Sequence, residues 1–414
     1  MTTFPRPRFQ LPWSVVGNLA ATSLRLGLLF LVGREVARHL GSEGIVVMGQ
    51  LQNLMGLGLA LPSMALNSGI QQALGSATDA QVPERSSWAL LSGQALAVLS
   101  ALVVTGLVLT GSVYLPEVVG RTVWMLVPGV CAMALVGNLQ AISAGRRRMG
   151  KLNLFIAASG PLQALWLFAW IHLGLVGLAP GVVLFGLVAA PCAAFLLSPL
   201  PLSWPRRDQW REQAKLWAPL AAMGSVVAVL GPLKNILFRE TLLAQGIDAA
   251  GDWQAAARLA ELVFATWTAA FSTWALPRLS GPAERRPGLQ RLALCPLGAL
   301  AIGIVLAGLG AWLLDLAYVG RFPGALPVLR LQCLAEVVQA STVPLGLILI
   351  ARRSLKAYAG LEISAAILQL LLVRLLVPSF GPVGVPLSIA LESSVYLAVA
   401  WWLVRRREVV TLAP

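Results

Sequence analysis

Seven basic side chains lie inside stretches of sequence that are otherwise apolar. They are Arg25, Arg34, Lys234, Arg239, Arg258, Arg330 and Arg374. A charged side chain at the centre of a bilayer costs roughly 2.5–3.5 kcal/mol on insertion scales, so a helix retains one where the interior of a bundle uses it. Guanidinium groups pair bidentately with phosphate oxygens and stay protonated. These residues therefore predict a cavity that binds an anion.

Acidic residues at comparable depth complicate this prediction. They are Glu35, Glu240, Glu261, Glu336, Glu362 and Glu392. Arg258 and Glu261 are three residues apart, which is the spacing of an ion pair on one helix face. The pairs Arg34-Glu35 and Arg239-Glu240 lie near the predicted outer ends of their helices, where long side chains reach the interface. We expect Glu240, Glu336, Glu362 and Glu392 to lie deep enough to take up a coupling cation.

Arg25 lies near the middle of the first apolar stretch and has no acid within four residues. The second stretch contains Asn67 and other amides, which bind hydroxyl-rich ligands or join neighbouring helices. The predicted substrate-binding set is Arg25, Arg34, Lys234, Arg258, Arg330, Arg374 and Asn67.

The elements that hold these side chains are membrane-spanning helices. Of the 414 residues, 57% are hydrophobic and 12% are charged, whereas a water-soluble domain averages about 25% charged residues. About twelve apolar stretches are long enough to cross a bilayer. They lie near 12–40, 44–73, 87–114, 122–144, 152–174, 176–200, 214–243, 252–276, 290–314, 324–350, 356–378 and 383–404. The composition predicts an all-α integral membrane protein whose first apolar stretch is too long for a cleavable signal.

The distribution of basic residues gives an orientation. Of the 31 basic residues, 21 fall in the termini and the loops on one side, and only Arg38, Arg121 and Arg321 fall in the opposite loops. The positive-inside rule then predicts that both termini are cytoplasmic. Because the basic residues occupy separate short loops, no nucleic-acid partner is expected. The four cysteines and two histidines show no metal-ligand spacing, so we expect no metal and no cofactor.

The sequence resembles itself at a shift of about 205 residues. Arg34-Glu35 falls on Arg239-Glu240, and Gly41 falls on Gly246. This repeat predicts an N-terminal lobe of six helices over 1–210 and a C-terminal lobe over 211–414, arranged around a central cationic cavity. Because six is even, an axis along the membrane normal would relate the lobes, as in transporters with alternating access.

Residues 31–54, LVGREVARHLGSEGIVVMGQLQNL, and 65–75, ALNSGIQQALG, carry a resemblance to a known family. Their shared features are L-V-G-basic at 31–34, Ala37, the Gly41-x-x-Gly44 turn and Asn67-x-Gly69. They are similar to polysaccharide lipid flippases of the Wzx type, in particular those for enterobacterial common antigen, within the multidrug/oligosaccharidyl-lipid/polysaccharide exporter superfamily.

The resemblance implies a multi-pass protein of the bacterial inner membrane that flips undecaprenyl-diphosphate-linked oligosaccharide from the cytoplasmic to the periplasmic leaflet. It implies that Arg25 and Arg34 contact this substrate, although the acid at Glu35 departs from the family pattern. Membrane lipids, a polysaccharide polymerase and chain-length proteins are the other implied partners.

Three other functions remain open at this point. A multidrug exporter of the same superfamily would need a carboxylate where the first stretch offers Arg25. A polymerase or ligase acting on the same lipids would need a large outer loop, and no outer loop exceeds about fifteen residues. A scaffold of the polysaccharide assembly machinery would not transport lipid, and a flipping assay distinguishes a flippase from such a scaffold. We expect this chain not to be an enzyme.

Overall fold

The computed structural model describes residues 13–75, 77–146, 148–197, 210–279, 289–352 and 354–411, and within these ranges the chain is helical with no strand. A membrane offers no water to the backbone, so an apolar chain must satisfy its amides within each segment, as a helix does. The first part of the chain forms α1 (Trp13–Leu59), a π-helical turn (Ala60–Ala65), α2 (Leu66–Gly75), α3 (Val82–Leu109), α4 (Glu117–Gly120), a 3-10 turn (Val123–Met125), α5 (Leu126–Gly145), α6 (Met149–Ile171), α7 (Gly174–Val183) and α8 (Phe185–Leu197).

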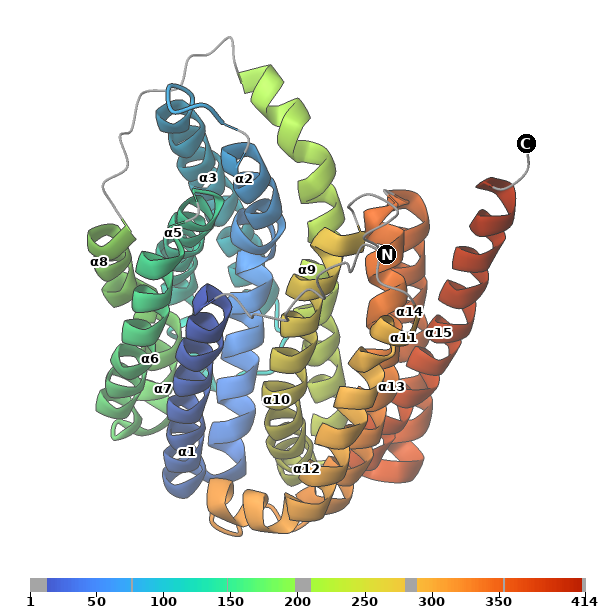
Figure 1. The fold of residues 1–414 in the computed structure, drawn as a ribbon. Coiled ribbons are helices and arrows are strands. Elements are labelled where there is room, and N and C mark those ends of the chain that lie inside the picture. The colour runs from blue at the N-terminus through green and yellow to red at the C-terminus, as the bar shows by residue number, and fades with distance from the viewer. Residues whose placement is uncertain are drawn as a thin grey trace.

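The second part forms α9 (Trp210–Leu243), α10 (Ile247–Leu279), α11 (Leu289–Leu292), α12 (Leu294–Tyr318), α13 (Ala325–Ala351), α14 (Leu355–Phe380), a 3-10 turn (Gly381–Val383) and α15 (Gly384–Thr411). Figure 1 shows these helices running alongside one another.

The helices account for the expected passes. Eight segments of the described chain are long and apolar enough to cross a membrane, and two of them, Gly27–Gly75 and Lys356–Arg406, are about 50 residues long. Each of these two turns back on itself, at Gly41 (φ 62°) and at Gly381 (φ 60°), where glycine adopts the left-handed backbone without a Cβ penalty. Each of these two segments therefore makes two passes, so the eight segments make ten. The helices α9 and α10, of 34 and 33 residues, are also long enough to cross a membrane but carry more polar side chains. With them, the described helices make the predicted twelve passes.

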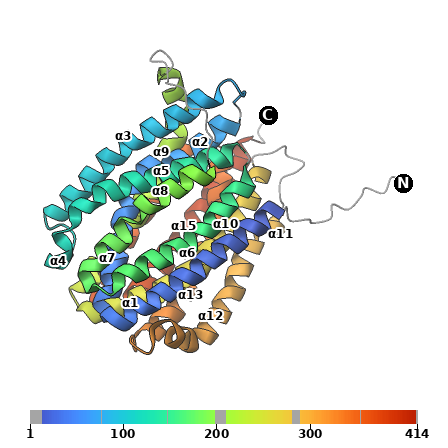
Figure 2. The ribbon, with the colours of Figure 1, turned by 90° about the vertical axis from the view of Figure 1, so that its left-hand side faces the viewer.

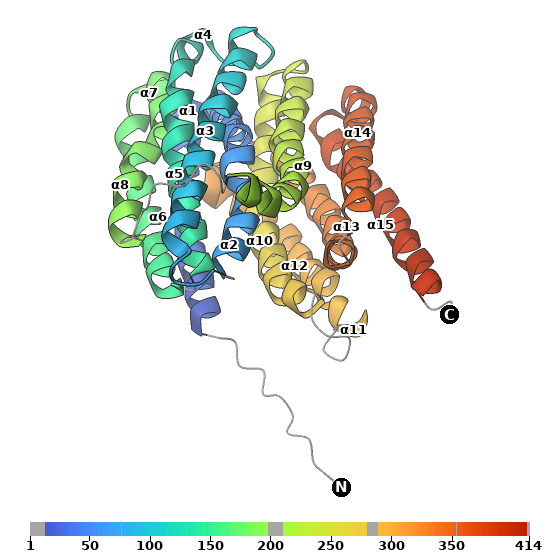
Figure 3. The same cartoon turned by 90° about the horizontal axis from the view of Figure 1, so that it is seen from above.

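The first and last halves of the chain form two groups of helices. Figures 1 and 3 show α1 to α8, in blue to green, on one side and α9 to α15, in yellow-green to red, on the other. Between the groups, α1 and α2 pack against α9 and α10. The predicted lobe boundary at 210/211 falls at the start of α9, next to residues 198–209, which lie outside the described residues.

Contacts between the groups follow the spacing of the repeat. The Ser42 hydroxyl donates to Asp248 Oδ1 at 2.8 Å, and Arg258 Nη1 donates to Gln52 Oε1 at 2.8 Å. Both contacts join residues 206 positions apart, as expected near an axis that relates two repeats. These contacts support the two-lobe division, which stays a prediction.

Large apolar side chains cover the outside of the bundle. Phe195 is 84% exposed, and Leu375 and Leu165 are 70% and 68% exposed. Figure 2 shows α1, α3, α5, α6 and α8 lying side by side and nearly parallel on this face of the first group. A monomeric soluble protein rarely exposes so much contiguous apolar surface, whereas a lipid bilayer solvates it.

Candidate functional site

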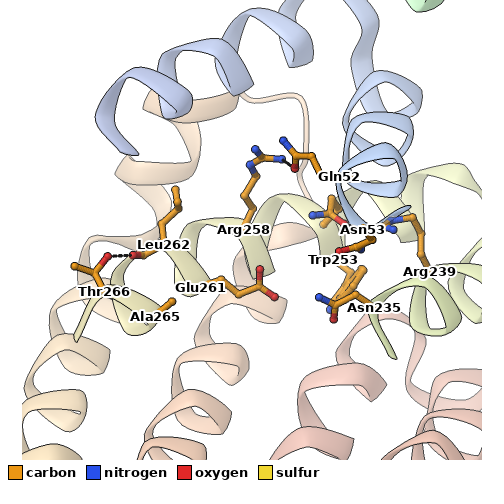
Figure 4. Close-up of a pocket in the computed structure, with 12 residues that line it drawn as sticks. Gln52, Asn53, Asn235, Arg239, Trp253, Arg258, Glu261, Leu262, Ala265 and Thr266 are labelled. Carbon is orange, nitrogen blue, oxygen red and sulfur yellow. Dashed lines mark hydrogen bonds between the residues drawn. The ribbon is translucent and has the colours of Figure 1, made fainter. Parts of the chain in front are cut away.

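A cavity of about 450 Å³ lies between the two groups of helices. Its polar lining comes from α1, α9 and α10, and Figure 4 shows these side chains converging on one hollow. The lining residues are Gly49, Gln52, Asn53, Asn235, Arg239, Trp253, Gln254, Arg258, Glu261, Leu262, Ala265 and Thr266. We call this hollow the interlobe cavity.

Helix periodicity places the polar residues of α10 on one side. Gln254, Arg258, Glu261 and Ala265 follow one another at steps of four, three and four residues, which keeps them on the same helix face. The other positions of α10 contribute buried apolar residues such as Phe264. The second half of α1 faces this row and supplies the amides of the cavity.

Arg239 is buried, with 1% of its surface exposed. Its guanidinium donates to Gln50 Oε1 on α1 and to Gln254 Oε1 on α10, and it lies 5.7 Å from the centroid of the Trp253 ring. Gly49 permits this approach, because a Cβ added there would lie 2.7 Å from Arg239 Nη2. The expectation that Arg239 extends to the outer interface is therefore wrong, since neutral amides inside the bundle hold the side chain.

Arg258 also points into the interlobe cavity. Its hydrogen bond to Gln52 joins the two groups, and Figure 4 shows Arg258 turned toward Gln52 and away from Glu261. The ion pair expected between Arg258 and Glu261 does not form: both residues lie on the same helix face, but the Arg258 side chain extends to Gln52 on α1 instead of toward Glu261. A guanidinium bonded to a neutral amide keeps its charge available to an anion.

Two more cavities follow the interlobe cavity, and each shares lining residues with the one before it. The first, of about 320 Å³, shares Asn235 and Glu261 with it and adds Lys234 and Glu336. Gln332 Nε2 donates to Glu336 Oε1 at 2.9 Å. A carboxylate predicted for cation coupling thus lies next to the cationic site.

The second adjoining cavity, of about 290 Å³, shares Lys234 with the first. Glu362 and Glu392 line it from α14 and α15. The Tyr396 hydroxyl donates to Glu362 Oε1 at 2.9 Å, and the Ser393 hydroxyl donates to Glu392 Oε2 at 3.2 Å. The three hollows place the guanidinium groups and Glu261 at one end, Lys234 and Glu336 in the middle, and Glu362 and Glu392 at the other end.

Arg25 lines a separate cavity of about 220 Å³ within the first group of helices. Arg25 Nη2 donates to Gln163 Oε1 at 3.2 Å, and Asn67 lines the same hollow. Within the described part of the chain, Arg25 Nε and Asn67 Oδ1 are buried without a hydrogen-bond partner. The structure therefore brings two predicted site residues together, but away from Lys234 and Arg258.

Three predicted cations lie outside the cavities described here. Arg330 and Arg374 are exposed on α13 and α14, and Arg34 is half-buried on α1. A long basic side chain at such a position can extend its charge toward water.

Glu240 has a structural position between the two groups. Its Oε1 accepts from Gln50 Nε2 and from the backbone N–H of Tyr114, both at 2.7 Å. Glu240 thus joins α9 to α1 and to the loop after α3, whereas the other acids predicted for cation coupling line the cavities.

Arg239 and Glu261 are cavity residues that the sequence analysis assigned to structural roles. The four-three-four spacing along α10 was the signal that places Glu261 on the Arg258 face. For Arg239 no local signal exists, because its partners Gln50 and Gln254 come from other helices.

Known proteins are similar to this chain in sequence or in fold. No family model matches the chain. It is 24% identical over 383 residues to the Lipid III flippase of Escherichia coli (strain K12), covering 88% of this chain and 91% of that protein, and the Lipid III flippase of Shigella flexneri gives the same figures.

Solved structures of transporters superpose on nearly the whole chain. A multidrug resistance MATE family transporter of the MOP superfamily aligns in its inward-facing conformation with a TM-score of 0.71 and 13% identity, over 95% of this chain and 98% of that one. A MOP superfamily transporter from Pyrococcus furiosus, described as having a binding pocket of reverse polarity, aligns with a TM-score of 0.68 and 14% identity, over 95% of each chain. The resemblance to lipid flippases and the all-α membrane transporter fold predicted from the sequence are both confirmed.

Proposed function

We propose that this chain is a flippase that moves an oligosaccharide linked to polyprenyl diphosphate from the cytoplasmic to the periplasmic leaflet of a bacterial inner membrane. The observation that carries the proposal is the Arg258 guanidinium, which faces a cavity between the two groups of helices and is bonded to the neutral amide of Gln52. The flippase relatives named above support the same substrate class.

Arg258 and Arg239 suit a diphosphate. A guanidinium presents several N–H donors in a planar fork that matches two phosphate oxygens. The amides of Asn53 and Asn235 line the same hollow and offer hydrogen bonds to sugar hydroxyls. The site thus matches both parts of the headgroup.

The membrane potential favours the proposed direction. Moving two negative charges outward across 100 mV releases roughly 4–5 kcal/mol, at about 2.3 kcal/mol per charge. The headgroup must pass the carboxylates of Glu336, Glu362 and Glu392 on its way to Arg258, and uptake of a proton or a sodium ion there would lower the repulsion. This route places the cation-coupling acids before the phosphate site.

Alternating access requires that contacts between the two groups break. In the predicted orientation, the hydrogen bonds of Ser42 to Asp248 and of Tyr114 to Glu240 lie near the periplasmic ends of the helices. We propose that these bonds close the periplasmic side while the headgroup binds, and that they open when it leaves.

The test is flipping by the purified protein alone. Liposomes containing the protein receive a fluorescent lipid-linked oligosaccharide diphosphate, and a membrane-impermeant quencher reports the lipid that reaches the outer leaflet. The expected result is a protein-dependent flipping rate. A chain that binds the lipid but flips none of it without polymerase or chain-length proteins would instead be a scaffold.

Multidrug export is a second candidate because four carboxylates, Glu261, Glu336, Glu362 and Glu392, line the connected cavities. Carboxylates at such depth bind cationic drugs, and solved drug transporters share the fold. Efflux of a cationic dye from intact cells tests it. Efflux that is lost in a Glu336→Gln variant but kept in an Arg258→Gln variant would favour drug export over lipid flipping.

A further inference from the structure

A fifth cavity, of about 280 Å³, lies between α14 and α15, and its lining is mainly apolar. The lining residues are Ala357, Gly360, Leu361, Ser364, Ala365, Leu368, Glu392, Val395, Tyr396, Val399 and Leu403. Val395 and Val399 are 49% and 39% exposed on the outside of the bundle. Figure 1 shows α15, in red, at the edge of the molecule, so this hollow faces lipid, and we call it the lateral groove.

The lateral groove is continuous with the polar cavities. It shares Ala365, Glu392 and Tyr396 with the cavity that contains Lys234. The hydrogen bond from the Tyr396 hydroxyl to Glu362 joins α15 to α14 at this junction. A path therefore leads from an apolar surface, past a tyrosine and carboxylates, to Lys234 and then to the guanidinium groups.

The groove belongs to the cytoplasmic half of the molecule in the predicted orientation. Its residues come from the first half of α14 and the middle of α15, and the outer ends of these two helices meet at the turn through Gly381–Val383. A lipid in the cytoplasmic leaflet lies at the depth of these residues.

We infer that the lateral groove holds the isoprenoid tail of the transported lipid while its diphosphate-sugar headgroup occupies the polar cavities. This inference rests on the proposed function and adds where the tail lies. An amphiphile is stabilised when its apolar chain stays out of water and its charged head meets polar groups. The lateral groove offers the apolar environment and the adjoining cavities offer the polar one, and the two meet at Tyr396 and Glu392.

A bulky side chain in the groove tests the inference. Gly360 lines the groove, and an added Cβ would meet no heavy atom within 4 Å, so the backbone there accepts a side chain and Gly360→Phe adds a bulky ring to the groove lining. We expect flipping of the long-tailed lipid to slow by about tenfold, which corresponds to roughly two methylene groups that lose their burial. Flipping of an analogue with a two-isoprene tail should remain within about twofold of wild type.

Ile367→Phe is the matched control, because Ile367 lies on the same helix, is 55% exposed and does not line the groove. It should flip both lipids at the wild-type rate. If wild-type protein flips neither lipid, the proposed function fails. If wild-type protein flips the long-tailed lipid and Gly360→Phe flips it equally fast, the groove assignment alone is overturned.

A binding measurement gives an independent readout. Farnesyl diphosphate with a photoreactive group at the end of its tail should label peptides of α14 and α15 in the full-length protein. Unlabelled polyprenyl diphosphate should compete, and an equal excess of phospholipid should not. Labelling that phospholipid removes equally well would assign the groove to ordinary lipid, and labelling confined to other helices would overturn the inference.

Discussion

Replacing Arg258 by glutamine tests the phosphate site most directly. The substitution keeps a polar side chain and removes the charge and the planar fork. Two charge-assisted hydrogen bonds to phosphate contribute about 3 kcal/mol at the lower end of their range, because each is worth about 1.5 kcal/mol. This loss corresponds to roughly a 100-fold increase in the KM for the lipid, at about 1.4 kcal/mol per factor of ten.

The structural cost of the same substitution is smaller. Arg258 loses its 2.8 Å hydrogen bond to Gln52, which lowers the free energy of unfolding by about 1.5 kcal/mol. Thermal unfolding in detergent measures this loss separately from transport.

Gln52→Ala separates a substrate ligand from a cross-link between the two groups of helices. It breaks the same hydrogen bond as Arg258→Gln and leaves the guanidinium in the interlobe cavity. We expect its flipping rate in liposomes to stay close to wild type, as for Arg330→Gln, which removes an exposed charge outside the cavities. If Gln52→Ala raises the KM as much as Arg258→Gln, Arg258 acts as a cross-link and the assignment to phosphate binding is refuted.

Three further predictions follow from other contacts. Arg25→Gln should slow flipping by about tenfold, because the predicted charge-assisted hydrogen bond from Arg25 to the lipid headgroup is worth about 1.5 kcal/mol. Gln163→Ala removes only the acceptor that Arg25 uses within the protein and should leave the flipping rate near wild type. Equal effects of the two substitutions would mean that the hydrogen bond between Arg25 and Gln163 is structural. A Ser42→Cys, Asp248→Cys pair should form a disulfide that stops flipping until it is reduced, because the Ser42 hydroxyl lies 2.8 Å from Asp248 Oδ1. Full flipping activity of the oxidised pair would refute the proposed opening of the periplasmic side. Gly49→Ala should lower the free energy of unfolding by about 1–3 kcal/mol through overpacking against Arg239, and an unchanged denaturation midpoint would contradict that packing.

Hydropathy was sufficient to predict most of the fold. Long apolar stretches must form helices in a bilayer, since no other local conformation satisfies the backbone there. The limits of α9 and α10 were less evident, because both helices carry the polar residues of the interlobe cavity and neither is among the strongly apolar segments. The apolar stretches predicted at 214–243 and 252–276 nevertheless fall within these two helices.

The candidate site was predicted in part. Lys234, Arg258, Glu336, Glu362 and Glu392 line connected cavities, as residues buried at mid-depth were expected to do. Depth along a helix follows from the sequence because each residue adds a fixed rise. The direction in which a side chain leaves its helix does not follow from the sequence, and Arg330 and Arg374, which were predicted from depth alone, are exposed and line none of the cavities in the described part of the chain.

The sequence by itself determined that this chain crosses a membrane as helices, and that it keeps unusual charges within them. These properties follow from local composition and from the low dielectric constant of lipid. Only the tertiary structure decided which groups each charged side chain contacts. Arg239 finds its partners 189 and 15 positions away, and Arg25 lies in a cavity of its own, because the rotation of each helix and the packing of the two groups set these contacts.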